Sequence, residues 1–174
     1  MSLFCRPFSL EAASKILSVN VSEAAIRIEG LRNSQVVSVV PEAKELLYDI
    51  HPLMRKFLKS IGNSKAFVDV FQKAKDNFCS HFISQLTKIA ALLDKEYVKA
   101  FDRYDFEKLN FELALDISLK FSYLLIPRHH QESVMICYLL EAMLNDEKRR
   151  RKIFHAWAEK VEEDGKEGED KFLL

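Results

Sequence analysis

The sequence predicts an all-α protein, a multi-helix bundle of about six or seven helices. Glycine is absent from Asn63 through Asp164, and Pro127 is the only proline in that stretch. Because glycine and proline most often interrupt regular structure, a long stretch that lacks them is typical of long helices. Apolar residues make up 48% of the chain and 13 residues are Phe, so a buried core is expected.

Two short helices are expected near the N-terminus. Ser9 is a typical N-cap for a first helix that ends at about Leu17, and Ser22 is the expected cap of a second helix that Gly30 closes. Residues 35–40, QVVSVV, form the only strand-like run, which is too short to make a sheet unless it pairs as a small wing or across a dimer. The pair of helices with its tight connection resembles a helix-turn-helix, and the whole forms a short N-terminal hairpin.

The resemblance implies a second helix that enters the major groove of DNA. In that helix Arg27 and Arg32 are the only cations, so these are the expected nucleic-acid contacts. Glu23 and Glu29 lie beside them, and Ser18 stands where such motifs commonly have glycine. These departures favour the alternative of a plain helical hairpin.

The next segment is expected to be a kinked helix followed by one long helix. The first begins at Pro41, runs through residues 46–50, is kinked or split at Pro52 and ends at Gly62. Beyond it, apolar residues recur every three or four positions and predict one helix of roughly 45 Å. These apolar positions are Phe67, Phe71, Ala74, Phe78, Phe82, Leu86, Ile89 and Leu93.

The remaining sequence predicts three more helices. Asp105 is the expected N-cap of a helix over 106–125, which is apolar on most of its circumference and therefore central. Pro127 ends that helix, because the residue before a proline is disfavoured in the α region. Further helices are expected from Glu132 to about Asn145 and over about 148–161.

The chain is expected to divide into an N-terminal hairpin over 1–40, a helical bundle over 41–158 and a charged mobile tail over 159–174. The tail carries seven acids from Glu159 to Asp170. It ends in three apolar residues, which are expected either to fold back onto the body or to serve as a docking peptide. This docking tail is Phe172, Leu173 and Leu174.

Five consecutive cations form the sharpest charge feature of the sequence. Such a basic patch could hold phosphates or an acidic partner. The alternative is a solvated helix face that the nearby acids neutralise, and the net charge of zero favours it. The patch consists of Lys148, Arg149, Arg150, Arg151 and Lys152.

Arg150 and His155 match the Arg-x4-His pattern of the HEPN ribonucleases, which are also small helical bundles. The resemblance implies that Arg150 would act on the scissile phosphate and His155 on the attacking 2′-hydroxyl. The polar residue that usually follows the arginine is replaced here by Arg151. A pattern this loose also arises by chance in a basic helix.

Motifs for cofactors and metals are absent from the sequence. There is no GxxxxGK[ST], GxGxxG, GxSxG or Glu-x-x-His motif, so no cofactor and no metal site is expected. The three cysteines are odd in number and form no CxxC pair, which is typical of a reducing compartment. No window is long and uncharged enough to span a bilayer, so a soluble, cytoplasmic protein is expected.

The sequence therefore predicts a non-enzymatic intracellular interaction or assembly subunit. Its partner would be a protein, with a second copy of the chain as one candidate because a long Phe-striped helix often needs a cover. The first alternative is a nucleic-acid-associated protein that uses the helix-turn-helix-like segment and the basic helix. The second alternative is a ribonuclease of the HEPN type.

Overall fold

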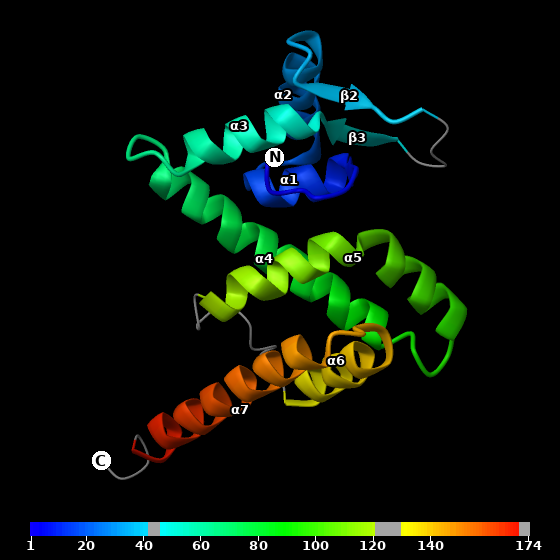
Figure 1. Ribbon diagram of the computed structural model, residues 1–174, viewed down its shortest axis with the longest axis vertical. Helices are drawn as coiled ribbons and strands as arrows, with labels where there is room; N and C mark the ends of the chain where they lie inside the picture. Colours follow the sequence, from blue (N-terminus) through cyan, green and yellow to red (C-terminus); the bar gives the residue numbers. More distant parts are fainter. Residues whose placement is uncertain (42–45, 121–129, 171–174) are drawn as a thin grey trace. The chain divides into compact units, whose positions relative to one another are not determined.

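The computed structural model describes residues 1–41, 46–120 and 130–170, without the side chains of 120, 130–134 and 160–170. Helices dominate the described chain and a small sheet accompanies them (Figure 1), so the prediction of a multi-helix bundle is confirmed. The chain divides into two compact units, Met1–His81 and Phe82–Leu174. The elements in order are β1 Phe8–Ser9, α1 Leu10–Leu17, α2 Val21–Asn33, β2 Val37–Val39, β3 Leu47–Ile50, α3 Pro52–Gly62, α4 Val68–Ala90, α5 Tyr97–Lys120, α6 His130–Met143 and α7 Glu147–Asp170.

The first helix, α1, has the predicted start and end. Ser9 caps it, because its Oγ accepts a hydrogen bond from the backbone N–H of Ala12 at 3.1 Å. Ser18 follows the last turn in the left-handed region, with φ at 53°, and its N–H donates to the carbonyl of Lys15. The conformation of Ser18 explains why glycine often occupies the corresponding position of such turns.

The second helix, α2, begins earlier and ends later than predicted. Its N-cap is Asn20 and not Ser22, because the Asn20 Oδ1 accepts from the N–H of Glu23 at 2.8 Å. Gly30 does not close the helix, which continues to Asn33. A single glycine inside a helix costs only about 1 kcal/mol, and the residues around it supply the remaining turns.

A three-stranded sheet follows the strand order β1-β3-β2, with both pairs antiparallel. The strand-like run 35–40 is confirmed as β2, and Val37 lies opposite Ile50. The predicted helix over 46–50 is wrong, since Leu47–Ile50 is strand β3. Tyr48 and Ile50 are buried, whereas the residues before each of them are less so, and this alternation with a period of two is typical of a strand. Strands β1 and β2 pair with β3 on its two sides.

Pro52 is the first residue of α3. The sequence had predicted a longer helix that is kinked or split at Pro52, but strand β3 precedes the proline. Proline lacks only an N–H that the first turn would leave unpaired, so it fits this position well. Before it, the Nδ1 of His51 accepts from the N–H of Leu53 at 3.3 Å and caps the helix. At the other end, a Cβ on Gly62 would lie 2.8 Å from Cγ of Phe71, so α3 and α4 approach closely here.

Aromatic rings form the core of the first unit. Phe4 stacks on Phe8 with ring centroids 4.3 Å apart, and its edge meets Phe78 of α4 at 5.8 Å. The Nδ2 of Asn77 donates to the carbonyl of Ile16 at 2.9 Å and so joins α4 to the end of α1. All three Phe side chains are buried, as the apolar period predicted for Phe78.

The second unit has its own aromatic core, in which Phe111 of α5 contacts both Phe82 and Tyr104 at centroid distances of 5.7 and 5.5 Å. The predicted N-cap at Asp105 is wrong, because α5 is continuous from Tyr97. Tyr104 is only 2% exposed, so the turns before Asp105 already have a core-facing side. The chain break therefore lies before Tyr97, earlier than predicted.

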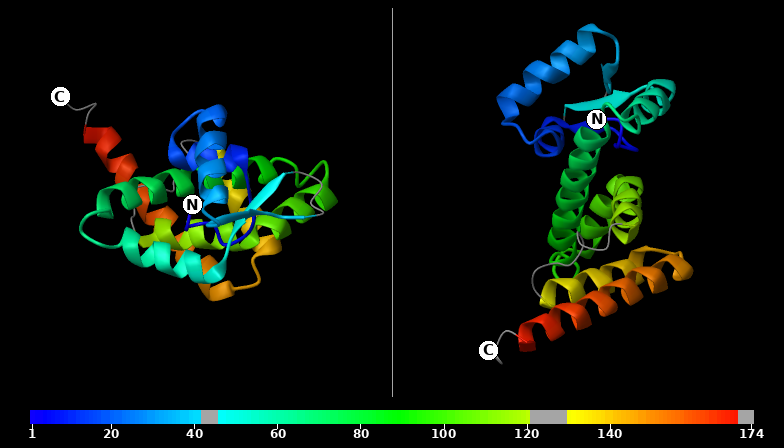
Figure 2. Two further views of the ribbon diagram at one scale, coloured as in Figure 1. Left: turned by 90° about the horizontal axis from the view of Figure 1, so that it is seen from above. Right: turned by 90° about the vertical axis from the view of Figure 1, so that its left-hand side faces the viewer.

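The last two helices lie side by side (Figures 1 and 2). Leu139 and Leu140 of α6 and Ile153 of α7 are fully buried, in line with the apolar positions of these segments. The backbone of α7 is helical to Asp170, which extends beyond the predicted end at about Val161. The expected helix end at Pro127 lies outside the described residues.

Candidate functional site

Two large apolar side chains of α3 are exposed to solvent. Leu53 is 69% exposed and Phe57 is 58% exposed, and they lie one helical turn apart on the same side. We call this pair, Leu53 and Phe57, the α3 face. Pro52 at the start of the helix is also exposed, three further apolar side chains are half-buried, and only Gly62 is fully buried. These half-buried residues are Met54, Leu58 and Ile61.

An arginine occupies the inward side of the same helix. Arg55 has a side chain only 17% exposed, and its Nη2 lies 2.7 Å from Oδ1 of Asp49 on β3. Exposed Leu and Phe beside an inward Arg reverse the usual preference, since charged side chains normally face water. The ion pair helps α3 to hold this orientation, and the α3 face is exposed within the described part of the chain.

Two lysines of α3 lie to one side of the α3 face, with no acidic partner among the described residues. Lys56 is exposed and Lys59 is half-buried, and neither forms an ion pair within the described part of the chain. Residues 50–68 contain no Asp or Glu at all. The α3 face is therefore an apolar surface with a positive border.

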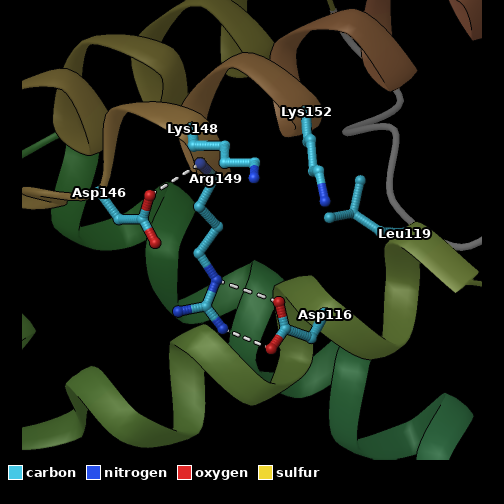
Figure 3. A pocket seen from close by; sticks show the side chains of 6 residues that line it. All are labelled: Asp116, Leu119, Asp146, Lys148, Arg149 and Lys152. Carbon is cyan, nitrogen blue, oxygen red and sulfur yellow. Dashed lines mark hydrogen bonds and ion pairs between the residues drawn. The ribbon is translucent and has the colours of Figure 1, made fainter.

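The basic patch at the start of α7 is divided by an ion-pair network with α5, shown in Figure 3. The Nε of Arg149 donates to Oδ1 of Asp116 at 3.0 Å, and its Nη2 bonds the other oxygen of that carboxylate. The Nη1 of Arg149 lies 2.9 Å from Oε2 of Glu112. Partial burial opposes the charge, but the two carboxylates raise the pKa of Arg149. Neutralisation of this arginine thus comes from two acids of α5.

The other cations of the patch have different surroundings. Arg151 pairs with Glu147 within α7 at 2.6 Å, and Nη1 of Arg150 donates to the carbonyl of Leu144. Lys148 and Lys152 border a cavity of about 570 Å³ on α5 and α7 (Figure 3). The remaining residues that line this cavity are Asp116, Leu119, Asp146 and Arg149.

The two residues of the Arg-x4-His pattern have separate partners. His155 is 73% exposed and its Nδ1 lies 3.3 Å from Oε1 of Glu159, whereas Arg150 bonds the carbonyl of Leu144. Residues five positions apart on a helix differ in direction by about 140°. The guanidinium and the imidazole are therefore not brought together on one side of α7.

The proposed nucleic-acid contacts on α2 are both ion-paired. Nη2 of Arg27 lies 2.5 Å from Oε1 of Glu23, and Nη2 of Arg32 lies 3.0 Å from Oε1 of Glu29. Ile26, which directly precedes Arg27, is 74% exposed. Each positive charge on this outer side is offset by an acid one turn away.

No family model, no curated protein and no solved structure matches this chain. Among the described residues, no three side chains of His, Cys, Asp or Glu are grouped so that they could hold a metal ion. Within the same residues, every helix is too short or too polar to cross a membrane.

One predicted site lies outside the described residues, and one exposed surface was not predicted. The docking tail, Phe172, Leu173 and Leu174, lies outside the described residues. The α3 face was not predicted, although Leu53 and Phe57 already stand four positions apart beside a cluster of cations. That spacing predicts an apolar helix side but does not tell whether the side is covered.

Proposed function

We propose that this protein is a non-enzymatic interaction subunit that docks a partner protein through the α3 face. The observation that supports the proposal is the exposure of Leu53 and Phe57 beside the inward Arg55. Burial of one such side chain contributes roughly 1.5–3 kcal/mol, so a partner that covers both gains appreciable binding energy. Large side chains in the middle of an interface usually carry most of its affinity.

We propose that the protein acts inside the cell, as its cysteine pattern indicates. A catalytic role has less support. Arg150 and His155 each have another partner on or beside α7, so the residues that the HEPN resemblance implies are not assembled into one site. A reacting phosphate needs both groups within hydrogen-bond reach.

Nucleic-acid binding is a second candidate, favoured by one observation. α1, the turn at Ser18 and α2 are followed by the antiparallel pair β2–β3, which is the layout of a helix-turn-helix with a wing. A gel-shift titration with duplex DNA at low salt tests it. Retardation that weakens with salt and is lost in Arg27→Ala/Arg32→Ala would favour this candidate, and no retardation at low salt would exclude it.

The docking proposal is tested by co-isolation of partners with wild-type protein and two double variants. Leu53→Ala/Phe57→Ala removes the α3 face. Val98→Ala/Phe101→Ala is the matched control, because Val98 and Phe101 are also exposed, at 72% and 47%. We expect specific proteins to be lost with the first variant and retained with the control, while thermal melts show that both variants stay folded.

One outcome of this co-isolation would contradict docking through the α3 face. If all three forms of the protein isolate the same partners in the same amounts, the α3 face does not dock them.

A further inference from the structure

We infer that the segment docked on the α3 face is an acidic amphipathic helix of the partner protein. This inference rests on the proposed function and names the partner's chemistry. The charges of the sequence around α3 support it, since residues 50–68 contain no acid. The cations in the same stretch are Arg55, Lys56, Lys59 and Lys65.

The position of Lys56 relates this charge directly to the α3 face. Lys56 lies three positions after Leu53, so these two side chains are neighbours on the helix surface, whereas Phe57 points about 100° away from Lys56. All three residues are exposed, as is Ser60 one turn further on. The solvent side of α3 therefore combines an apolar pair with a lysine at its edge.

The positive charges of this border are available to a partner. Arg55 is already engaged with Asp49 at 2.7 Å. Among the described residues, no ion pair involves Lys56, Lys59 or Lys65. An incoming carboxylate would thus form a new ion pair, whereas an incoming lysine or arginine would be repelled.

The shape of the surface favours a helix as the docked segment. Leu53 and Phe57 are four positions apart on one helix side, which is the spacing at which the apolar residues of a second helix can interdigitate. The matching segment would have large apolar residues at steps of three or four and Asp or Glu beside them.

Anionic lipid headgroups offer the same negative charge, but the structure favours a protein. α3 is held in its unit by the Arg55–Asp49 pair and by the close contact of Gly62 with Phe71. A helix that lies in a membrane surface needs a broad apolar face turned outward. Here only Leu53 and Phe57 of α3 are exposed large apolar residues.

Selection of random phage-displayed peptides on the purified full chain tests the inference. Peptides that bind Leu53→Ala/Phe57→Ala equally well are removed by counter-selection. We expect the remaining peptides to be enriched in Asp and Glu over the library, with large apolar residues at helical spacing. Fluorescence anisotropy with an enriched peptide should show affinity at least about tenfold lower for Lys56→Glu/Lys59→Glu, and falling with salt.

Three results would overturn the inference, and they differ in their consequences. Peptides that require Leu53 and Phe57 but have no excess of acids would refute the acidic partner and leave the docking proposal intact. No peptide that depends on these two residues would refute both. If wild-type protein, and not Leu53→Ala/Phe57→Ala, co-sediments with phosphatidylserine vesicles while peptides fail, the surface binds lipid.

Circular dichroism melts of the variants ensure that lost binding does not reflect unfolding. Lys56→Gln/Lys59→Gln is a second variant that removes charge without adding repulsion. Its affinity for the enriched peptides should fall less than that of Lys56→Glu/Lys59→Glu. Equal affinity of the wild type and both charge variants would overturn the role of the lysines.

Discussion

The Nη2 atom of Arg55 donates to Oδ1 of Asp49 at 2.7 Å, and this ion pair joins α3 to β3. It lies on the side of α3 that faces the rest of the unit. With Arg55 inward, Leu53 and Phe57 on another side of the helix remain in water. The internal ion pair and the exposed α3 face therefore accompany one helix orientation.

Removal of the Arg55 side chain should destabilise the protein. We expect Arg55→Ala to lower the free energy of unfolding by about 1–2 kcal/mol, because a charge-assisted hydrogen bond to Asp49 is lost. Urea denaturation followed by circular dichroism measures the change. The control Lys56→Ala removes an exposed cation without an ion pair and should stay within about 0.5 kcal/mol of wild type. Equal stability of the two variants would contradict the structural role of Arg55.

Two of the helical glycines, Gly62 and Gly30, should respond to alanine in opposite directions. A Cβ at Gly62 would lie 2.8 Å from Cγ of Phe71, so Gly62→Ala should cost about 1–3 kcal/mol. At Gly30 nothing lies within 4 Å of the new Cβ, and Gly30→Ala should stabilise α2 by about 0.5–1 kcal/mol. Thermal melts of both variants compare them directly. A stabilising Gly62→Ala would show that α3 and α4 do not meet as described.

Tyr104 provides a test at high pH. Burial, and secondarily Glu112, raises the pKa of its hydroxyl from 10.0 to about 12. The unfolded state therefore ionises first, and the stability present below pH 10 should decline as pH rises from 10 to about 12. Urea titrations across this range measure the decline.

The control for Tyr104 is removal of the hydroxyl alone. This atom is buried and has no hydrogen-bond partner among the described residues, so Tyr104→Phe should be neutral or slightly stabilising near neutral pH. In this variant, the part of the stability loss between pH 10 and about 12 that comes from Tyr104 should be absent. A clear loss of stability at neutral pH would mean that the hydroxyl has a partner.

Arg149 should matter more for stability than any neighbouring cation of the basic patch. Arg149→Met removes the link to Asp116 and Glu112 and leaves two partly buried carboxylates, at an expected cost of about 2 kcal/mol. Arg151, whose side chain is 79% exposed, pairs with Glu147 within one helix, and Arg151→Ala should change stability by less than about 0.5 kcal/mol. Denaturation curves that shift equally for both would refute the ion-pair network.

The elements that the sequence predicted well depend on local signals. Ser9 caps α1 because an N-cap acts within one turn of its own position. The apolar period through Phe78 and Phe82 predicted α4, since a repeat of three and four residues reflects one buried helix side. These features can be recognised without knowledge of the rest of the fold.

The features that could not be predicted depend on residues far away in the chain. The apolar residues of segment 46–50 would also fit the buried side of a helix. The segment forms strand β3 because β1 and β2 pair with it. Arg149 finds its partner Asp116 33 positions earlier, on another helix. Whether Leu53 and Phe57 are covered likewise depends on the packing of α3, which its own sequence does not contain.

Site-specific photo-crosslinking at position 57 tests the central claim most directly. Benzoylphenylalanine in place of Phe57 keeps an aromatic side chain on the α3 face, and the same replacement at Phe101 is the control on α5, where the side chain is 47% exposed. Irradiation in the cells of origin, followed by mass spectrometry, identifies the crosslinked peptides. We expect position 57 to yield a discrete protein adduct that position 101 does not give. No adduct at position 57, or the same adducts at both positions, would contradict docking through the α3 face.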